Sequence, residues 1–415
     1  MLPVLPARLS YVLVGLLVTT VLFYASFRPP TSQEQNVLDL PEQGTFAPDP
    51  LPSPSRPAAT TILEDPSLYR VQNETLGFQE VYMISLPART DKRDAFAMQA
   101  AFSGISYTQM DGVDGKLVPE KALPHTMDQN ANAIGCWRAH LDVIQRIVRE
   151  KVSTALIFED DADWDVSFKK QLVQFARGSR YILKTPAHKS PFSPYGDDWD
   201  LLWLGHCGTW VHPEDNRRFF VIPDDPTVEP PEYRKNVDVP DMSHWEQGPN
   251  GDNRTRIVFN SEGGVCTASY AISQQGARKA LYHMSMEPYN SPIDWGFSNL
   301  CKDSAYNFTC VSVFPQIVGV SRPTSNTSKW SDIGYGEDRG VEPANAPHLV
   351  YSTRLNMGNL LAGKTVFDSQ YPDVTPAQLD IKDIGKAVGH IEVLELEPEP
   401  KSEPEPEPEP EPPSE

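Results

Sequence analysis

The middle of the chain alternates between short apolar runs and segments with helical periodicity, and this alternation restricts the fold most strongly. Residues 81–86 and 154–158 are apolar runs of strand length, whereas residues 133–150 carry apolar side chains at steps of three and four. The same criteria predict further strands at 107–110, 199–204 and 265–272, and further helices at 95–102 and 274–283. We therefore expect an α/β fold with a mostly parallel central sheet flanked by helices.

The N-terminal segment is strongly apolar. Residues 9–27 carry no charge, and their number is close to the roughly 20 residues that a helix needs to cross a bilayer. The run predicts an uncleaved transmembrane signal anchor after a short cytosolic tail of residues 1–8. The alternative is a cleavable signal peptide that ends near residue 26. Both interpretations direct the rest of the chain into the secretory pathway. We favour the anchor, and therefore expect a single-pass type II protein of the Golgi or ER membrane with a luminal catalytic domain.

Proline and acidic residues are distributed unevenly along the chain. The sequence has 40 prolines and a net charge of −20, which argues against a nucleic-acid partner held by bulk charge. Proline-rich composition predicts a stem at 28–78, and repeated Glu-Pro pairs predict an acidic disordered tail at 395–415. Between them we expect a catalytic domain at 79–345 and a C-terminal extension at 346–394.

Four of the five residues that directly follow the apolar run at 154–158 are acidic: Glu159, Asp160, Asp161 and Asp163. Carboxylates packed together repel one another unless a positive charge lies among them. A divalent metal such as Mn²⁺ or Mg²⁺ supplies that charge and commonly bridges protein carboxylates to substrate phosphates. Because ligands of α/β proteins bind at the carboxyl ends of strands, the cluster predicts a metal–diphosphate site. The alternative is a solvated acidic turn that caps a strand.

Other candidate residues each have a functional and a structural interpretation. The turn after the first strand contains Arg89, Lys92 and Arg93, and the guanidinium groups of Arg89 and Arg93 suit nucleotide phosphates, although surface arginines also aid solubility. Asp294 follows a proline turn and is either a general base for an acceptor hydroxyl or a helix N-cap. His140, beside the apolar stripe of its helix, is more often a packed histidine than a catalyst.

The chain has five cysteines, so complete internal pairing is excluded. Their spacing contains no Cys-x-x-Cys or Cys/His pattern typical of structural zinc. Cys301 and Cys310 flank a polar segment that holds the glycosylation sequon at Asn307, and they are a plausible disulfide pair.

In their order along the chain, these motifs resemble glycosyltransferase family 25, which contains lipooligosaccharide β-galactosyltransferases and procollagen galactosyltransferases. The resemblance extends from about residue 81 to residue 294. The matching residues are Asp111, Gly112, Gly135, Cys136, His140, Leu141, Glu159, Asp160, Asp161, Tyr270, Ser273, Gly276, Ala277, Arg278 and Asp294. Ser85 and Ala139 depart from the family pattern, which has Asn and Ser at these positions.

The resemblance implies a GT-A-type nucleotide-sugar-binding fold, a UDP-sugar donor, a divalent metal that is usually manganese, and inversion at the anomeric carbon. It implies that Glu159 and Asp161 bind the metal, with Asp163 as a further acid, and that Asp160 lies near the ribose. Asp294 is our candidate for the base. The donor-binding positions are predicted to include Arg89, Arg93, Asp111, Asp160 and His140.

Three hypotheses remain at this point. The first is a membrane-anchored luminal glycosyltransferase that transfers a sugar, galactose from UDP-galactose, to a hydroxyl of a glycan or glycoprotein. The second is a non-catalytic glycan-binding or scaffold protein with the same fold, which the departures at Ser85 and Ala139 motivate. The third is a metal-dependent hydrolase that uses the same acids.

Overall fold

The structure, a computed structural model, describes residues 66–395 except 187–189, 236–237, 248–250 and 335–337. The expected anchor at 9–27, most of the expected stem and the Glu-Pro tail lie outside the described residues. Within the described ranges, no helix combines the length and the apolar character that crossing a membrane requires.

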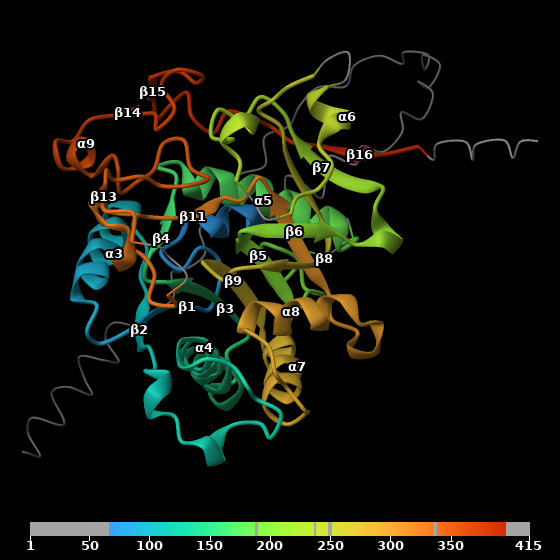
Figure 1. Cartoon of the computed structure of the whole chain (residues 1–415). Coiled ribbons are helices and arrows are strands. Elements are labelled where there is room, and N and C mark those ends of the chain that lie inside the picture. The colour runs from blue at the N-terminus through green and yellow to red at the C-terminus, as the bar shows by residue number, and fades with distance from the viewer. Residues whose placement is uncertain (1–65, 187–189, 236–237, 248–250, 335–337, 396–415) are drawn as a thin grey trace, which may run out of the picture. The chain divides into compact units, whose positions relative to one another are not determined.

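A ten-stranded mixed sheet forms the centre of the described body (Figure 1). From one edge to the other its strands are β16 (His390–Val393), β7 (Arg218–Ile222), β8 (Arg256–Val265), β10 (Cys310–Phe314), β5 (Leu201–Gly205), β9 (Ser269–Ser273), β3 (Thr154–Glu159), β1 (Glu80–Ser85) and β2 (Thr108–Asp111), with β6 (Gly208–Val211) paired to β8. Strand β1 is parallel to β2 and β3, and β5 is parallel to β10. Strand β9 lies antiparallel between β3 and β5, and β8 is antiparallel to β10. The α/β prediction is confirmed, with antiparallel strands inserted into the parallel set.

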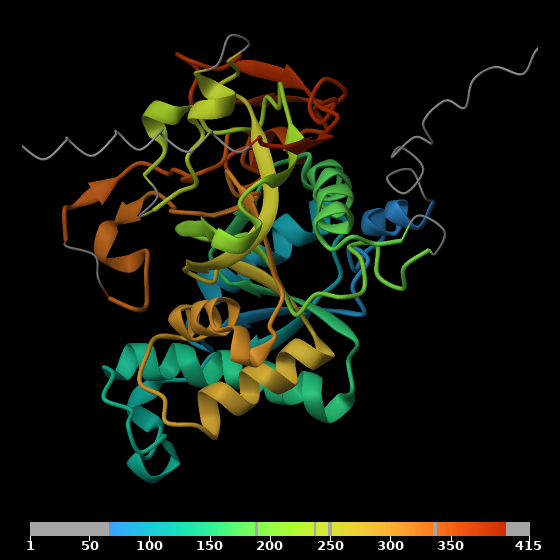
Figure 2. The same cartoon turned by 90° about the vertical axis from the view of Figure 1, so that its right-hand side faces the viewer.

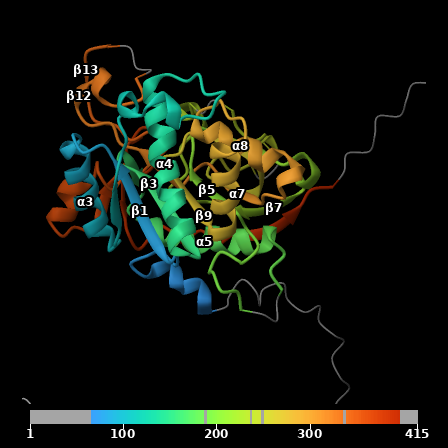
Figure 3. The same cartoon turned by 90° about the horizontal axis from the view of Figure 1, so that it is seen from below.

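Helices cover both faces of this sheet. One layer contains α4 (Ala131–Glu150), α7 (Gln274–Ser285) and α8 (Ile293–Lys302), and it is visible at the bottom of Figure 2. Figure 3 shows α4 and α7 side by side across the strands. The other face carries η1 (Pro66–Gln72), α3 (Thr90–Ser103) and α5 (Phe168–Ile182).

The two layers follow from the alternation of side chains along a strand. In β1, Tyr82 and Ile84 join the apolar core beneath α4, whereas Val81 and Met83 join the core beneath α3 and α5. Because both sets of side chains are buried, the sequence of this strand is apolar without alternation.

The predicted elements agree with the observed ones within a few residues, with one exception. The prediction of a single strand over 265–272 is wrong, because β8 ends at Val265 and β9 begins at Ser269. The chain turns between them at Cys266, whose φ of 66° is incompatible with an extended strand.

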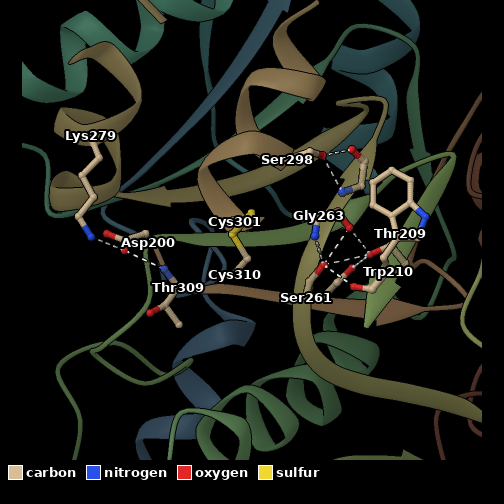
Figure 4. The surroundings of a disulfide bond; sticks show 12 residues. Asp200, Thr209, Trp210, Ser261, Gly263, Lys279, Ser298, Cys301, Thr309 and Cys310 are labelled. Carbon is tan, nitrogen blue, oxygen red and sulfur yellow. Dashed lines mark hydrogen bonds and ion pairs between the residues drawn. A yellow bond between two sulfur atoms is a disulfide. The ribbon is translucent and has the colours of Figure 1, made fainter. Parts of the chain in front are cut away.

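Two disulfides connect described segments. The prediction of a Cys301–Cys310 bond is confirmed, and it joins α8 to β10 (Figure 4). In the same view, Lys279 of α7 forms an ion pair with Asp200 (Nζ–Oδ2 2.8 Å), ahead of β5. The second bond, Cys207–Cys266, was not predicted, and Cys136 is the free cysteine.

The segment after residue 345 packs into the same body. A small apolar core forms from Val350, Tyr351, Phe367, Tyr371 and Ile384. It is bounded by α9 (Met357–Leu361), β14 (Val366–Asp368) and β15 (Gln378–Asp380), and the chain then adds β16 to the edge of the central sheet. The expected C-terminal extension therefore contributes structure to the domain that precedes it.

Close backbone packing fixes the loop after β2 against α4. A Cβ atom at Gly115 would lie 1.7 Å from the carbonyl oxygen of Ala131, and one at Gly135 would lie 2.4 Å from the carbonyl oxygen of Val113. Only glycine allows the loop and the helix to approach this closely. Gly115 of the loop and Gly135 of the helix therefore lie on the two sides of one close contact.

We expect Gly135→Ala to lower the free energy of unfolding by about 1–3 kcal/mol, because the added methyl group collides with backbone that must then move. Gly358→Ala is the matched control, since a Cβ atom in that helix meets nothing within 4 Å. Chemical denaturation of the full chain measures both. Equal stability of the two variants would contradict the proposed contact.

Candidate active site

The carboxyl ends of the three parallel strands bring the predicted residues to one edge of the sheet. In register, Ile84 of β1 pairs with Glu159 of β3, and Ser85 pairs with Asp111 of β2. The acidic cluster therefore begins where β3 ends, beside the turn that follows β1. This is the position at which α/β sheets bind ligands.

Two cavities open at this edge, with volumes of about 530 and 580 Å³. The turn after β1, the loop after β2 and the first half of α4 line the first cavity. The start of α8 and the segment after β11 (Val318–Val320) contribute to the second cavity. Both cavities share a wall formed by Cys136, Glu159, Asp161, Ser331 and Ile333. A ligand in the first cavity can thus reach a ligand in the second across the acidic residues.

Lys92 lies among the carboxylates. Its Nζ atom is 3.0 Å from Asp160 Oδ1, 3.1 Å from Asp161 Oδ2 and 2.9 Å from Asp332 Oδ2. Burial alone would lower the pKa of Lys92, but the charges of Asp161 and Asp160 raise it overall, so the ammonium group stays charged. Part of the charge compensation that the cluster requires is therefore supplied by the protein.

One carboxylate oxygen of the cluster lacks a hydrogen-bond partner among the described residues. Asp161 Oδ1 is buried and accepts no hydrogen bond within the described part of the chain. Burial and the charge of Asp161 raise the pKa of Asp160 to about 6, although Lys92 opposes the shift. A buried carboxylate oxygen without a partner beside a second, destabilised carboxylate fits a divalent cation with oxygen ligands.

A second group of possible ligands lies at the shared wall. Cys136 Sγ, a ring nitrogen of His140 and a carboxylate oxygen of Glu159 lie within 4.8 Å of one another. His140 Nδ1 is 3.0 Å from the Tyr270 hydroxyl, and Thr267 donates to Glu159 Oε1 at 2.5 Å. Burial alone would raise the pKa of Glu159, but the hydrogen bond from His140 lowers it overall, so Glu159 remains ionised. His140 is thus both a packed histidine and part of the cavity wall.

Asp163 points away from both cavities. It lies on β4 (Ala162–Trp164) and is fully buried, and it accepts hydrogen bonds from Gln99 Nε2 at 2.9 Å, the Trp164 amide at 2.8 Å and Ser352 Oγ at 2.5 Å. Burial raises its pKa. These contacts give Asp163 a structural position and argue against its predicted place among the metal ligands.

The two predicted arginines and Asp111 are engaged with other parts of the chain. Arg93 donates to the Ser85 carbonyl oxygen at 2.7 Å and to Asp111 Oδ1 at 2.8 Å, which ties the ends of β1 and β2 together. Arg89 pairs with Asp91 and Asp332. None of these three lines either cavity, so the two cavities do not support the prediction that Arg89, Arg93 and Asp111 contact a donor.

Asp294 lines the second cavity near the start of α8. Its Oδ2 atom accepts from the Cys266 amide at 2.8 Å, and Oδ1 accepts from the Trp295 amide at 2.9 Å. The carboxylate is therefore held in place by two backbone donors while it faces the cavity. The interpretation of Asp294 as a helix N-cap is wrong, because Pro292 holds that position and Asp294 lies in the first turn of α8. Its role as a base stays a prediction.

Several residues of the site were not predicted. The sequence shows that Lys92 lies in the basic turn with Arg89 and Arg93. Their spacing does not indicate which of the three side chains points toward the acidic cluster. Asp332 and Arg354 come from segments about 170 residues or more beyond the acidic cluster. No local pattern indicates that they meet it.

Comparison with known proteins identifies the matching part of the chain. Residues 78–194 match the sequence model of glycosyltransferase family 25 (LPS biosynthesis protein). Procollagen galactosyltransferase 1-A of Xenopus laevis is 25% identical over 222 residues, which is 50% of this chain and 29% of that protein. Procollagen galactosyltransferase 2 of Mus musculus is 25% identical over 237 residues, which is 53% of this chain and 30% of that protein.

A third relative has a different description. Inactive glycosyltransferase 25 family member 3 of Homo sapiens is 28% identical over 153 residues, which is 34% of this chain and 23% of that protein. The chain thus spans less than a third of the length of these three relatives. The matched region contains β1, the loop after β2, α4 and the acidic cluster, and it confirms the resemblance of this chain to glycosyltransferase family 25.

Proposed function

We propose that this chain is a glycosyltransferase that transfers a sugar from a UDP-sugar, UDP-galactose in the first instance, to a hydroxyl of a glycan or glycoprotein. The first cavity binds the nucleotide sugar and the second binds the acceptor. We assign the fold to the GT-A type on the basis of the α/β sheet, the acidic strand end and the family resemblance. The relatives named as procollagen galactosyltransferases support the choice of galactose.

The observation that carries this proposal is the half-buried Asp161 carboxylate at the wall between the two cavities, of which one oxygen is buried. Its Oδ1 atom lacks a hydrogen-bond partner in the described part of the chain, and the same side chain lines both cavities. A divalent cation at Asp161 would therefore be in contact with groups bound on either side.

Asp161 and Glu159 would hold Mn²⁺ or Mg²⁺, with Asp160 near the ribose. When bound, the metal supplies positive charge that stabilises the departing nucleoside diphosphate. Lys92, which already lies among the carboxylates, adds a second positive charge at the same edge. His140 orients Glu159, and Tyr270 orients His140.

Asp294 is the proposed base on the acceptor side. Its carboxylate is fixed by the amides of Cys266 and Trp295 and faces the second cavity. It would remove the proton of an acceptor hydroxyl as that oxygen attacks the anomeric carbon. A single displacement inverts the configuration, so no covalent intermediate with an enzyme group is needed.

We further propose that residues 9–27 anchor the protein in the Golgi or ER membrane as a single-pass type II protein. The support is the uncharged run of transmembrane length, followed by proline-rich sequence. The catalytic domain would then lie in the lumen, where its disulfides are stable.

A non-catalytic member of the family is the second candidate function. Lys92 neutralises part of the acidic cluster without a metal, and one relative is described as inactive. Release of UDP by the purified full chain from a panel of UDP-sugars with Mn²⁺, with and without acceptors, tests the proposal. Donor binding without turnover supports the second candidate, and turnover of glycosides or phosphate esters alone supports a hydrolase.

We expect Asp161→Asn to abolish Mn²⁺-dependent binding of UDP-galactose, because the amide replaces the carboxylate that the cation requires. Isothermal titration calorimetry with UDP-galactose and Mn²⁺ measures the loss. Asp94→Asn, at an exposed position of α3, is the control and should bind as the unmodified chain does. Unchanged binding by a folded Asp161→Asn variant would remove Asp161 from the site.

We expect Lys92→Met to bind Mn²⁺ more tightly, by about tenfold, since removing one positive charge from the carboxylates leaves more negative charge for the cation. The same variant should be less stable without metal, because Asp160 and Asp161 lose their ion pairs and Asp332 loses one of two. Metal titration and thermal unfolding measure the two effects. Lys121→Met, at an exposed position, serves as the control.

A Lys92→Met variant with weaker Mn²⁺ binding would contradict this account. It would show that Lys92 shapes the metal site and does not compete with the cation for it.

A further inference from the structure

The second cavity is lined by an arginine that has no ion-pair partner among the described residues. This residue is Arg322, and its guanidinium carbon lies 5.3 Å from the centroid of the Trp330 ring. Within the described ranges, no hydrogen bond engages this guanidinium group either. The indole nitrogen of Trp330 donates to the Pro323 carbonyl oxygen at 2.9 Å, so the ring beneath the arginine is fixed.

The backbone around Arg322 is tied directly to the acidic strand. Strand β11 pairs antiparallel with β4, and the Ser321 amide donates to the Asp161 carbonyl oxygen at 2.7 Å. Arg322 itself exchanges two backbone hydrogen bonds with Asn345, each of 2.9 Å. The backbone that carries the guanidinium group is therefore held at a defined position relative to the proposed metal ligand.

A second arginine reinforces the positive charge. Arg339 also lines the cavity, and its Nε atom lies 3.7 Å from Glu342 Oε1, at the rim of the ion-pair range. Burial and the charge of Arg339 lower the pKa of Arg322, whereas Asp161 and Glu342 act in the opposite direction. The lining of the same cavity also includes three carboxylates, so the two arginines, and not the cavity as a whole, supply the positive charge.

The cavity also presents an aromatic surface. Trp295 is 47% exposed and lines the cavity beside Asp294, and its ring centroid lies 6.0 Å from that of Trp210. An exposed indole face provides apolar contact for a sugar ring. The cavity thus combines a surface for a ring with an arginine fork suited to a planar or tetrahedral oxyanion.

We propose that the second cavity selects an anionic sugar as acceptor, with the acidic group bound by Arg322 and assisted by Arg339. This inference rests on the proposed function, because it assigns the acceptor class of the same site. Arg322 lines the second cavity and is not part of the first, so we assign it to the acceptor and not to the diphosphate of the donor.

A matched pair of probes tests this assignment. p-Nitrophenyl β-D-glucuronide and p-nitrophenyl β-D-glucoside differ in a carboxylate that replaces a hydroxymethyl group. Calorimetry measures the affinity of the full chain for each probe with Mn²⁺, in the presence and absence of UDP. We expect the glucuronide to bind about tenfold more tightly, the order of magnitude of one charge-assisted contact.

Arg322→Gln should bind the glucuronide and the glucoside with about equal affinity, while its affinity for UDP-galactose is unchanged. Arg322→Lys should retain part of the preference, because it keeps the charge and loses the planar fork. Arg149→Gln, at an exposed end of α4, is the control and should retain the full preference. If Arg322→Gln does not fold, Arg322→Lys and Arg339→Gln decide, and an undiminished preference in both overturns the proposal.

Other results would also overturn the proposal. They are equal affinity for the two probes, no binding of the glucuronide by the unmodified chain, or weaker UDP-galactose binding by Arg322→Gln with its probe preference intact. The last result would assign Arg322 to the donor diphosphate. Failure of the unmodified chain to bind any UDP-sugar would instead contradict the proposed function, and it is measured separately.

Discussion

The position of the acidic cluster depends on a buried network beneath it. Arg354 donates to the carbonyl oxygens of Asp160 and Ala162, each at 2.9 Å, and to Gln99 Oε1 at 2.6 Å. The Asp163 carboxylate accepts hydrogen bonds from Gln99 Nε2 and from Ser352 Oγ. Segments that lie far apart in sequence are thus joined under one short strand. Because Gln99, Asp163 and Ser352 are buried and hydrogen-bonded, they hold the backbone beside Asp160 and Asp161 in place.

Charge compensation at this edge is shared between the protein and a prospective cation. Lys92 pairs with one oxygen each of Asp160 and Asp161, and the remaining Asp161 oxygen is left without a partner in the described part of the chain. The lysine keeps the carboxylates together before any metal arrives. A metal would then meet a site in which part of the repulsion is already offset.

Much of the sheet and the place of the site could be predicted because they follow from local patterns. Apolar runs located β1, β3 and β5, and the acidic residues follow directly after β3. The direction of each side chain could not be predicted. It depends on the conformation of the short turn between β3 and β4, which points Asp161 toward the cavities and Asp163 away from them. The contributions of Asp332 and Arg354 depend on tertiary packing between segments about 170 residues or more apart, for which the sequence has no local signal.

The Cys207–Cys266 bond has a consequence for the acceptor side. Both cysteines line the second cavity, and the amide of Cys266 is one of the two donors that hold Asp294. The orientation of the proposed base is therefore coupled to a covalent bond that persists only under oxidising conditions. Reduction of this bond would leave the Cys266 amide without the covalent link to Cys207, so the proposed acceptor side should be sensitive to the redox state of its surroundings.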